Sequence, residues 1–225
     1  VRLWREARKT GRMPDPATLQ EAAGRSGFRK LHLDATHRTV TFDEAGMALD
    51  VGAIGKGYAA SEAIEVLDRL GVRSALVAVS GDLAFSEAPP GQRGWKIAVH
   101  TGDPSVVRVP RVLELTHAAV STSGSREQYV DIANRRYSHV IDPASGMGIV
   151  DDITVTVVAR HGLHADGLDT AISVLGAQRG LAFIESRADV AALIIQRTGT
   201  STRALPSSRF LQLLTYDRRP KAEPE

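Results

Sequence analysis

Residues 165–171, ADGLDTA, form the stretch that decides most of what this sequence predicts. The stretch follows a β-rich run and is expected to begin a helix. On a helix, Asp166, Asp169 and Thr170 occupy positions i, i+3 and i+4, so their oxygen atoms can converge on one ion. Oxygen ligands of this kind suit a hard cation such as Mg²⁺. The stretch therefore predicts a metal site at a helix in an α/β protein.

The same helix also permits a plainer interpretation. Leu168, Ala171, Ile172 and Leu175 form an apolar stripe, as in any amphipathic helix. Acidic residues in a first helical turn also interact favourably with the helix dipole. The helix alone therefore leaves both interpretations open.

A second motif, His139-x-x-Asp142-Pro143, precedes this helix in the chain. It places an imidazole near a carboxylate, and the proline ends the segment. Histidine is the common general base of enzymes, so His139 is a candidate for activating a hydroxyl group. Asp142 either orients the imidazole or caps a turn before the proline, and the sequence supports both roles.

Residues 50–60, DVGAIGKGYAA, lead from a predicted strand into a predicted helix. Glycines let a backbone approach a ligand closely, and a helix start can bind phosphate. The segment is not a Walker A loop, because only two residues separate Gly52 from Gly55 and no Ser or Thr follows Lys56. It matches a loose dinucleotide-binding pattern, but a strand meander precedes it. A plain strand–helix turn with a solvated Lys56 is the alternative.

Hydrophobic periodicity and turn residues predict the secondary structure. The expected helices span residues 15–24 and 55–71, with a helix pair over 165–186. The expected strands span residues 30–34, 39–42, 48–51, 74–79, 83–85, 95–100, 106–115, 117–121, 129–132, 137–141, 153–158 and 190–196. The chain shows neither strict βαβ alternation nor an internal repeat, so we expect a mixed α+β protein with a mixed β-sheet core and flanking helices. One domain over residues 1–216 and a charged tail over 217–225 are expected.

Composition limits the function classes. The 225 residues are 43% hydrophobic, with a formal net charge of +2 and scattered positive residues, so nucleic acid is not an expected partner. The sequence contains no cysteine, which excludes disulfides, thiolate catalysis and Cys-ligated zinc. No apolar run approaches the ~18 residues of a membrane span.

The order of the motifs resembles that of the FAD:protein FMN transferases, the ApbE family. The resemblance covers roughly residues 1–205 and the later two thirds of a typical member, so the family's N-terminal portion is expected to lie outside this sequence. The matching motifs are Asp50-x-Gly52-x-x-x-Lys56-Gly57-Tyr58, Ser80-Gly81-Asp82, Trp95-x-Ile97, Ser121-Thr122-Ser123-Gly124, His139-x-x-Asp142-Pro143-x-x-Gly146 and Asp166-x-Leu168-x-Thr170. Ser61 and Ser80 depart from the family pattern, since many members carry Asp and Gly there.

The resemblance implies that FAD is cleaved with Mg²⁺ and that FMN is attached to a threonine of an acceptor flavoprotein, releasing AMP. It also implies the site residues. The metal ligands would be Ala53 through its carbonyl, Asp166, Asp169 through its carbonyl, and Thr170. The FAD contacts would be Asp50, Lys56 and, through its backbone, Ile141, and the base would be His139.

Two other functions remain open. Water could replace the acceptor threonine, which would make the protein an FAD pyrophosphatase that releases FMN and AMP. A flavin-binding protein without catalysis is the second alternative. The resemblance also implies a location in the bacterial periplasm or at the outer face of the inner membrane, with any lipid anchor in the N-terminal portion.

Overall fold

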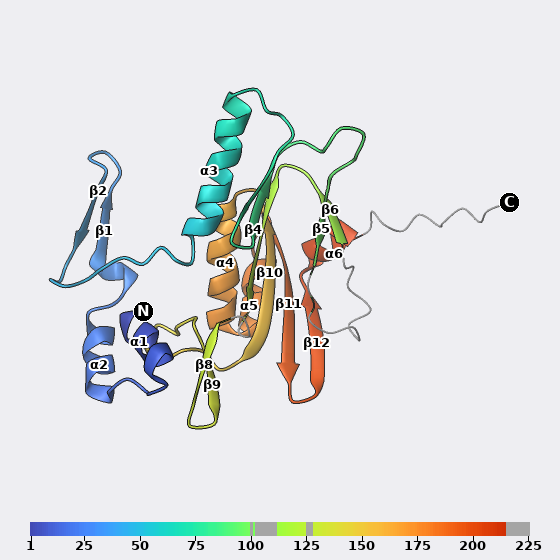
Figure 1. Ribbon diagram of the computed structural model, residues 1–225. Helices are drawn as coiled ribbons and strands as arrows, with labels where there is room; N and C mark the ends of the chain where they lie inside the picture. Colours follow the sequence, from blue (N-terminus) through green and yellow to red (C-terminus); the bar gives the residue numbers. More distant parts are fainter. Residues whose placement is uncertain (100, 102–111, 125–127, 215–225) are drawn as a thin grey trace. The chain divides into compact units, whose positions relative to one another are not determined.

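The computed structural model describes residues 1–99, 101, 112–124 and 128–214 (Figure 1). The chain divides into two compact units, which are described separately. The first unit comprises Val1–Val51 and Ser125–Val150, and the second comprises Gly52–Gly124 and Asp151–Glu225. Among the described residues, no helix is both long and apolar enough to cross a membrane.

The second unit is built on a six-stranded sheet with the order β12-β11-β10-β7-β4-β3. Every neighbouring pair in this sheet is antiparallel. The strands are β3 (Leu76–Val79), β4 (Asp82–Phe85), β7 (Ala118–Gly124), β10 (Asp152–Ala159), β11 (Val190–Thr198) and β12 (Ser201–Pro206). The predicted class, helices flanking a β-sheet core, is confirmed, but the prediction of a mixed sheet is wrong, because all five strand pairs of this sheet are antiparallel.

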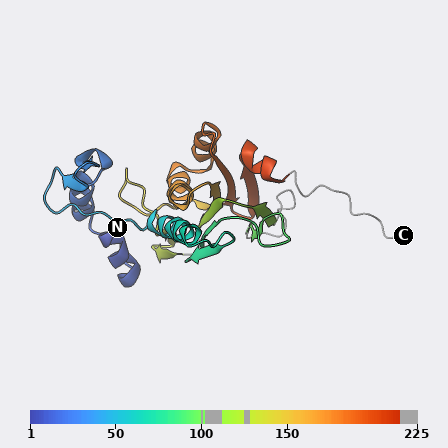
Figure 2. The ribbon, with the colours of Figure 1, turned by 90° about the horizontal axis from the view of Figure 1, so that it is seen from above.

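Both faces of the sheet are buried, because side chains of successive strand residues point to opposite faces. On β11, Ile194 packs into one core and Ile195 into the other. The first core includes residues of α3 (Gly55–Arg69), α4 (Gly162–Leu175) and α5 (Ala177–Glu185). The second includes residues of β5 (Trp95–Ala98), β6 (Val112–Leu115) and α6 (Ser208–Leu214). Helices α3 and α4 lie side by side, and α3 is seen nearly end-on from above (Figure 2).

The first unit contains two helices and two hairpins. Its elements are α1 (Arg2–Thr10), α2 (Pro16–Gly24), a 3₁₀ turn (Phe28–Lys30), β1 (Leu31–Asp34), β2 (Thr39–Phe42), β8 (Tyr129–Ile132) and β9 (Arg135–Ser138). A small core forms around Trp4, whose ring centroid lies 5.5 Å from that of Tyr137. The Trp4 indole N–H donates to the Gly146 carbonyl at 2.5 Å, so α1 is fastened to the loop after β9.

Several predicted elements are confirmed with small shifts. Asp15 caps α2 by accepting from the Thr18 N–H at 2.9 Å. Gly71, with φ of 86°, ends the region of α3. The helix containing Asp166 begins at residue 162, three residues earlier than predicted. Residues 48–51 form no strand, and the predicted strands at 100 and 106–111 and the tail 217–225 lie outside the described residues. The sequence patterns missed α1, β12 and α6.

Candidate metal and nucleotide site

Helices α3 and α4 touch through a pair of glycines. A Cβ atom added to Gly57 would lie 2.1 Å from the Gly162 carbonyl oxygen, and one added to Gly162 would lie 2.0 Å from the Gly57 carbonyl oxygen. Next to this contact, the Gly162 N–H donates to Ser61 Oγ at 2.7 Å. The start of α4, whose first N–H groups have no partner within the helix, is therefore capped from α3. Ser61 therefore joins the two helices at their crossing.

The close crossing brings Asp166 of α4 to the start of α3. Asp166 is only 2% exposed. Its Oδ1 accepts from Lys56 Nζ at 2.7 Å, and its Oδ2 accepts from the Gly57 N–H at 3.0 Å. Gly57 lies in the first turn of α3, where a carboxylate satisfies a backbone donor and interacts favourably with the helix dipole. Asp166 is thus a buried anion held by a second helix.

Asp82 is a second buried carboxylate, and the sequence motifs assigned it no role. It begins β4 and is 3% exposed. Its Oδ2 accepts from Lys56 Nζ at 2.7 Å, and its Oδ1 accepts from Ser121 Oγ at 2.7 Å. The signal that could have found it is an acid between the tight turn of Ser80 and Gly81 and the predicted strand at 83–85. Such an acid is rarely buried without a partner.

Asp169 is the third buried carboxylate, one turn after Asp166 on α4. Its Oδ2 lies 2.5 Å from Ser121 Oγ, and its Oδ1 accepts from the Thr170 hydroxyl at 3.1 Å. The Asp169 carbonyl, the predicted metal ligand, accepts from Ser173 Oγ at 2.9 Å. Ser121 has one hydroxyl proton and contacts carboxyl groups on both sides, so one of the two acids must supply a proton when both contacts are hydrogen bonds.

Burial dominates the electrostatics of this cluster. It raises the pKa of Asp169 to about 8 and also raises the pKa of Asp82 above its usual value. Burial lowers the pKa of Lys56, but hydrogen bonds and charges of Asp166 and Asp82 outweigh it, so the net pKa is raised. Asp82 and Asp166 share one ammonium group, and Asp169 is a third buried acid that is linked to Asp82 through Ser121.

The donor set of this cluster fits a hard divalent cation. Asp166, Asp169 and Thr170 lie on adjacent turns of α4, and each carries oxygen atoms of the type that such a cation prefers. Ala53 lies in the turn just before Ile54, the residue that caps α3. A bound cation would compensate the negative charge of the buried carboxylates, because burying a charge without a partner is costly. We call Lys56, Asp82, Ser121, Asp166, Asp169 and Thr170 the carboxylate cluster.

The other predicted site residues belong to the first unit. Asp50 Oδ2 pairs with the Arg5 guanidinium at 2.7 Å. Ile141 forms an isolated antiparallel bridge with Gly148. Asp142 caps its own turn, since its carboxylate accepts from the Ala144 N–H and the Ser145 hydroxyl.

His139 directly follows β9 and is oriented by a backbone carbonyl. The backbone N–H of His139 donates to the Gln128 carbonyl at 2.9 Å, and the ring nitrogen Nδ1 lies 3.1 Å from the same oxygen. A carbonyl oxygen only accepts hydrogen bonds, so this contact requires the proton on Nδ1. Nε2 is then the basic nitrogen of the neutral ring, as a general base requires.

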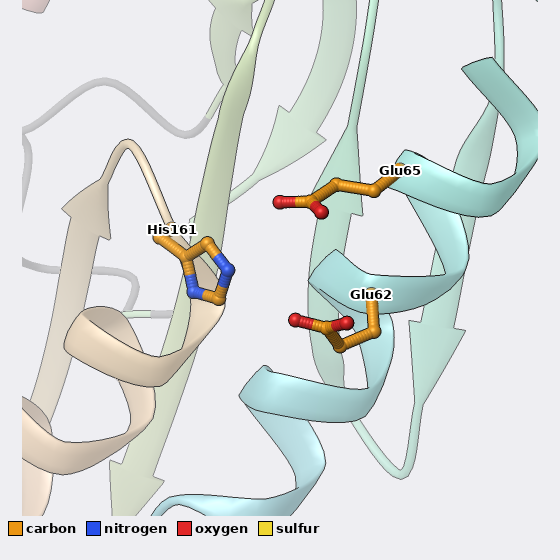
Figure 3. Close-up of side chains that lie close together, drawn as sticks. All are labelled: Glu62, Glu65 and His161. Carbon is orange, nitrogen blue, oxygen red and sulfur yellow. The ribbon is translucent and has the colours of Figure 1, made fainter. Parts of the chain in front are cut away.

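A second group of ionisable side chains lies on the same two helices. Glu62 and Glu65 of α3 and His161, the cap of α4, point toward one another with ligand atoms within 4.8 Å (Figure 3). His161 Nδ1 accepts from the Leu163 N–H at 3.2 Å. The other ring nitrogen therefore carries the proton of the neutral ring and acts as a donor, which argues against metal binding. This outer cluster borders a cavity of about 370 Å³.

Comparisons with known proteins agree with this architecture. A flavinyl transferase from Pseudomonas stutzeri, solved in its apo form, has 34% sequence identity and a TM-score of 0.78, covering 90% of this chain and 62% of the solved one. A flavin transferase from Vibrio cholerae has 27% identity and a TM-score of 0.78, covering 89% and 63%. The fold is thus that of flavin transferases.

The ApbE family model matches residues 1–194, and the chain belongs to the ApbE family. A protein from Treponema pallidum named FAD:protein FMN transferase is 31% identical over 209 residues, which are 87% of this chain and 58% of that protein. One of the same name from Salmonella typhimurium is 29% identical, over 92% of this chain and 59% of that protein. The chain therefore spans just under three fifths of these relatives.

Proposed function

We propose that the protein is an FAD:protein FMN transferase that uses Mg²⁺ and transfers FMN to a threonine of an acceptor flavoprotein. Family membership and the names of the relatives support the reaction. The observation that carries the proposal is the carboxylate cluster, in which Asp82 and Asp166 share one ammonium group and a third buried acid, Asp169, is joined to Asp82 through Ser121. Phosphoryl transfer from a pyrophosphate needs such a site, because charge develops on the phosphate oxygens.

The metal would be held by the Asp166 carboxylate, the Thr170 hydroxyl and the backbone carbonyls of Asp169 and Ala53. When bound, Mg²⁺ supplies charge neutralisation to the FAD pyrophosphate. These ligands are oxygen atoms, the type that Mg²⁺ prefers, and water and phosphate oxygens usually complete its coordination.

The remaining site residues would bind FAD and move a proton. Asp50, Lys56 and the Ile141 backbone would contact FAD. The acceptor threonine Oγ forms a bond to the phosphorus of the FMN half while the bond between that phosphorus and the bridging oxygen breaks, and AMP leaves with the oxygen. His139 Nε2 takes the threonine proton, a role worth about 10²–10⁴-fold in rate.

The proposal includes the setting of the reaction. The acceptor is a flavoprotein with an accessible threonine, and the place of action is the bacterial periplasm or the outer face of the inner membrane. This setting follows the resemblance of the motifs to the ApbE family, and secretion of a tagged protein would test it.

Mass spectrometry tests the reaction directly. The protein is incubated with FAD, Mg²⁺ and an acceptor flavoprotein domain, beside a matched acceptor in which the target threonine is replaced by valine. A mass gain equal to FMN on the threonine acceptor alone supports transfer. Release of FMN and AMP without a mass gain would make the protein a pyrophosphatase, and FAD recovered intact would leave only flavin binding.

A further inference from the structure

Lys56 occupies the position that a cation would take between two buried acids. Its Nζ lies 2.7 Å from Asp82 Oδ2 on β4 and 2.7 Å from Asp166 Oδ1 on α4. The two carboxylate side chains are 4% and 3% exposed, whereas the Lys56 side chain is 38% exposed. The lysine therefore reaches from the surface into an anionic interior.

This position conflicts with a bound metal. Asp166 Oδ1 is the acceptor for Lys56, and the Asp166 carboxylate is also the charged ligand assigned to Mg²⁺. Two cations at one carboxylate repel each other strongly at such distances, even with partial screening by solvent. The ammonium and the metal are then alternatives at Asp166 rather than companions.

We propose that Lys56 is a displaceable internal cation, which neutralises Asp82 and Asp166 in the metal-free protein and leaves Asp166 when a divalent cation binds. The inference rests on the proposed function, because it takes Asp166 as a metal ligand. It adds that metal binding releases the lysine for a second task.

The chemistry of the residue and its location suit both positions. A lysine carries a compact charge on a flexible stem, so its Nζ can move by several ångströms without moving the helix. Lys56 is the second residue of α3. A released ammonium at a helix start lies where backbone N–H groups and the helix dipole already favour phosphate. The same residue can thus protect the empty acids and later contact the FAD pyrophosphate.

Acylation of lysines in the wild-type protein tests the displacement without measuring activity. The protein is treated with an amine-selective acylating reagent, with and without Mg²⁺ and in the absence of nucleotide, and modification is measured by mass spectrometry. We expect Lys56 to react several-fold faster with Mg²⁺. The exposed Lys96 on β5 is the internal control and should not change. An unchanged or slower reaction at Lys56 would overturn the proposal.

A pair of variants provides the second test. Lys56→Met removes the ammonium and keeps the length of the side chain, and Lys96→Met removes one positive charge elsewhere. Calorimetric titration with Mg²⁺ alone should show that Lys56→Met binds Mg²⁺ about tenfold more tightly than the wild type, because the competing cation is gone. Lys96→Met should bind as the wild type does. Unchanged or weaker binding by Lys56→Met refutes the competition.

These tests separate the inference from the proposed function. If Lys56→Met does not fold, the acylation of the wild type decides alone. Neither measurement contains FAD or an acceptor. A protein that shows the displacement but attaches no FMN would keep the inference and lose the proposed function, whereas a protein that attaches FMN without the displacement would do the reverse.

Discussion

Two clusters of ionisable side chains involve helices α3 and α4 and differ chiefly in burial. In the carboxylate cluster, Asp82, Asp166 and Asp169 are almost fully buried, and their oxygens accept from one ammonium, one backbone N–H and two hydroxyl groups. In the outer cluster, Glu65 is exposed and Glu62 is half-buried. Acids in water need no partner, whereas buried acids do. Burial, rather than the spacing of acids, distinguishes the carboxylate cluster from the outer cluster.

The largest effect is expected for Asp166. Asp166→Ala should abolish Mg²⁺-dependent FAD cleavage and lower the free energy of unfolding by about 1–3 kcal/mol, because the buried Gly57 N–H loses its acceptor. From sequence alone, Asp166 would be placed on a polar face where substitutions cost about 0.5 kcal/mol, and its burial corrects that expectation. Asp166→Asn should also be inactive but more stable than Asp166→Ala. Denaturant unfolding and an AMP-release assay measure both effects, and an active Asp166→Asn variant would remove Asp166 from the metal site.

The second effect concerns pH and Asp169. Its pKa is raised from 3.8 to about 8 by burial, so the folded metal-free protein holds a proton that the unfolded chain releases above its ordinary pKa. The contribution to stability is complete below the unfolded pKa and is lost as the pH rises through about 8. The free energy of unfolding of the metal-free protein should therefore fall as the pH rises from 3.8 to about 8.

Asp169→Asn provides the comparison for this pH dependence. It should flatten the pH dependence of the melting temperature, since the amide does not titrate. Mg²⁺ should oppose the loss in the wild type, because a nearby cation favours the deprotonated form of the Asp169 carboxyl group. Equal pH slopes in the wild type and the variant would show that Asp169 is not the group responsible.

A smaller effect is expected for Ser61, which connects the two helices beside the carboxylate cluster. Ser61→Ala leaves the buried Gly162 N–H without its acceptor and should cost about 1–2 kcal/mol. Ser61→Asp retains an acceptor at this position and should recover most of that loss. Hydrogen exchange at the Gly162 amide follows the contact directly, and equal exchange in wild type and Ser61→Ala would mean that the cap does not protect the helix start.

The smallest effect is expected in the outer cluster. The double variant Glu62→Gln, Glu65→Gln should change the free energy of unfolding by about 0.5 kcal/mol or less, as is usual at exposed positions. It should leave FAD cleavage and Mg²⁺ affinity unchanged. A tenfold loss of affinity for Mg²⁺ or Zn²⁺ would make the outer cluster a metal site and contradict the comparison drawn above.

Local patterns predicted part of the site and could not predict the rest. The spacing of Asp166, Asp169 and Thr170 depends only on helix geometry, so their placement on adjacent turns of one helix was predictable. Their joint role as metal ligands stays a prediction. Asp82 and Ser121 lie on different strands, and their meeting depends on β4 pairing with β7 in a particular register. Strand pairing over such sequence distances leaves no local signal, which is also why the antiparallel order of the sheet could not be predicted.

The helices show the same difference between local and distant signals. Asp15 before Pro16 predicted α2 correctly because capping is local. The basic helix α1 was missed, since only Trp4 and Ala7 of its residues are buried and their partners come from a distant part of the chain. Contacts between residues far apart in sequence determine both α1 and the strand order of the sheet, so local patterns could predict neither.

The glycine contact between α3 and α4 has a consequence for how this protein tolerates sequence change. The spacing of the two helices is set there by backbone against backbone, at Gly57 and Gly162, and not by the size of any side chain. Residues elsewhere in the core can therefore be exchanged for others of different volume while the distance between Lys56 and Asp166 is preserved. A library that randomises the core should retain the contact between Lys56 and Asp166 in many members, whereas one that randomises either glycine should lose it in nearly all.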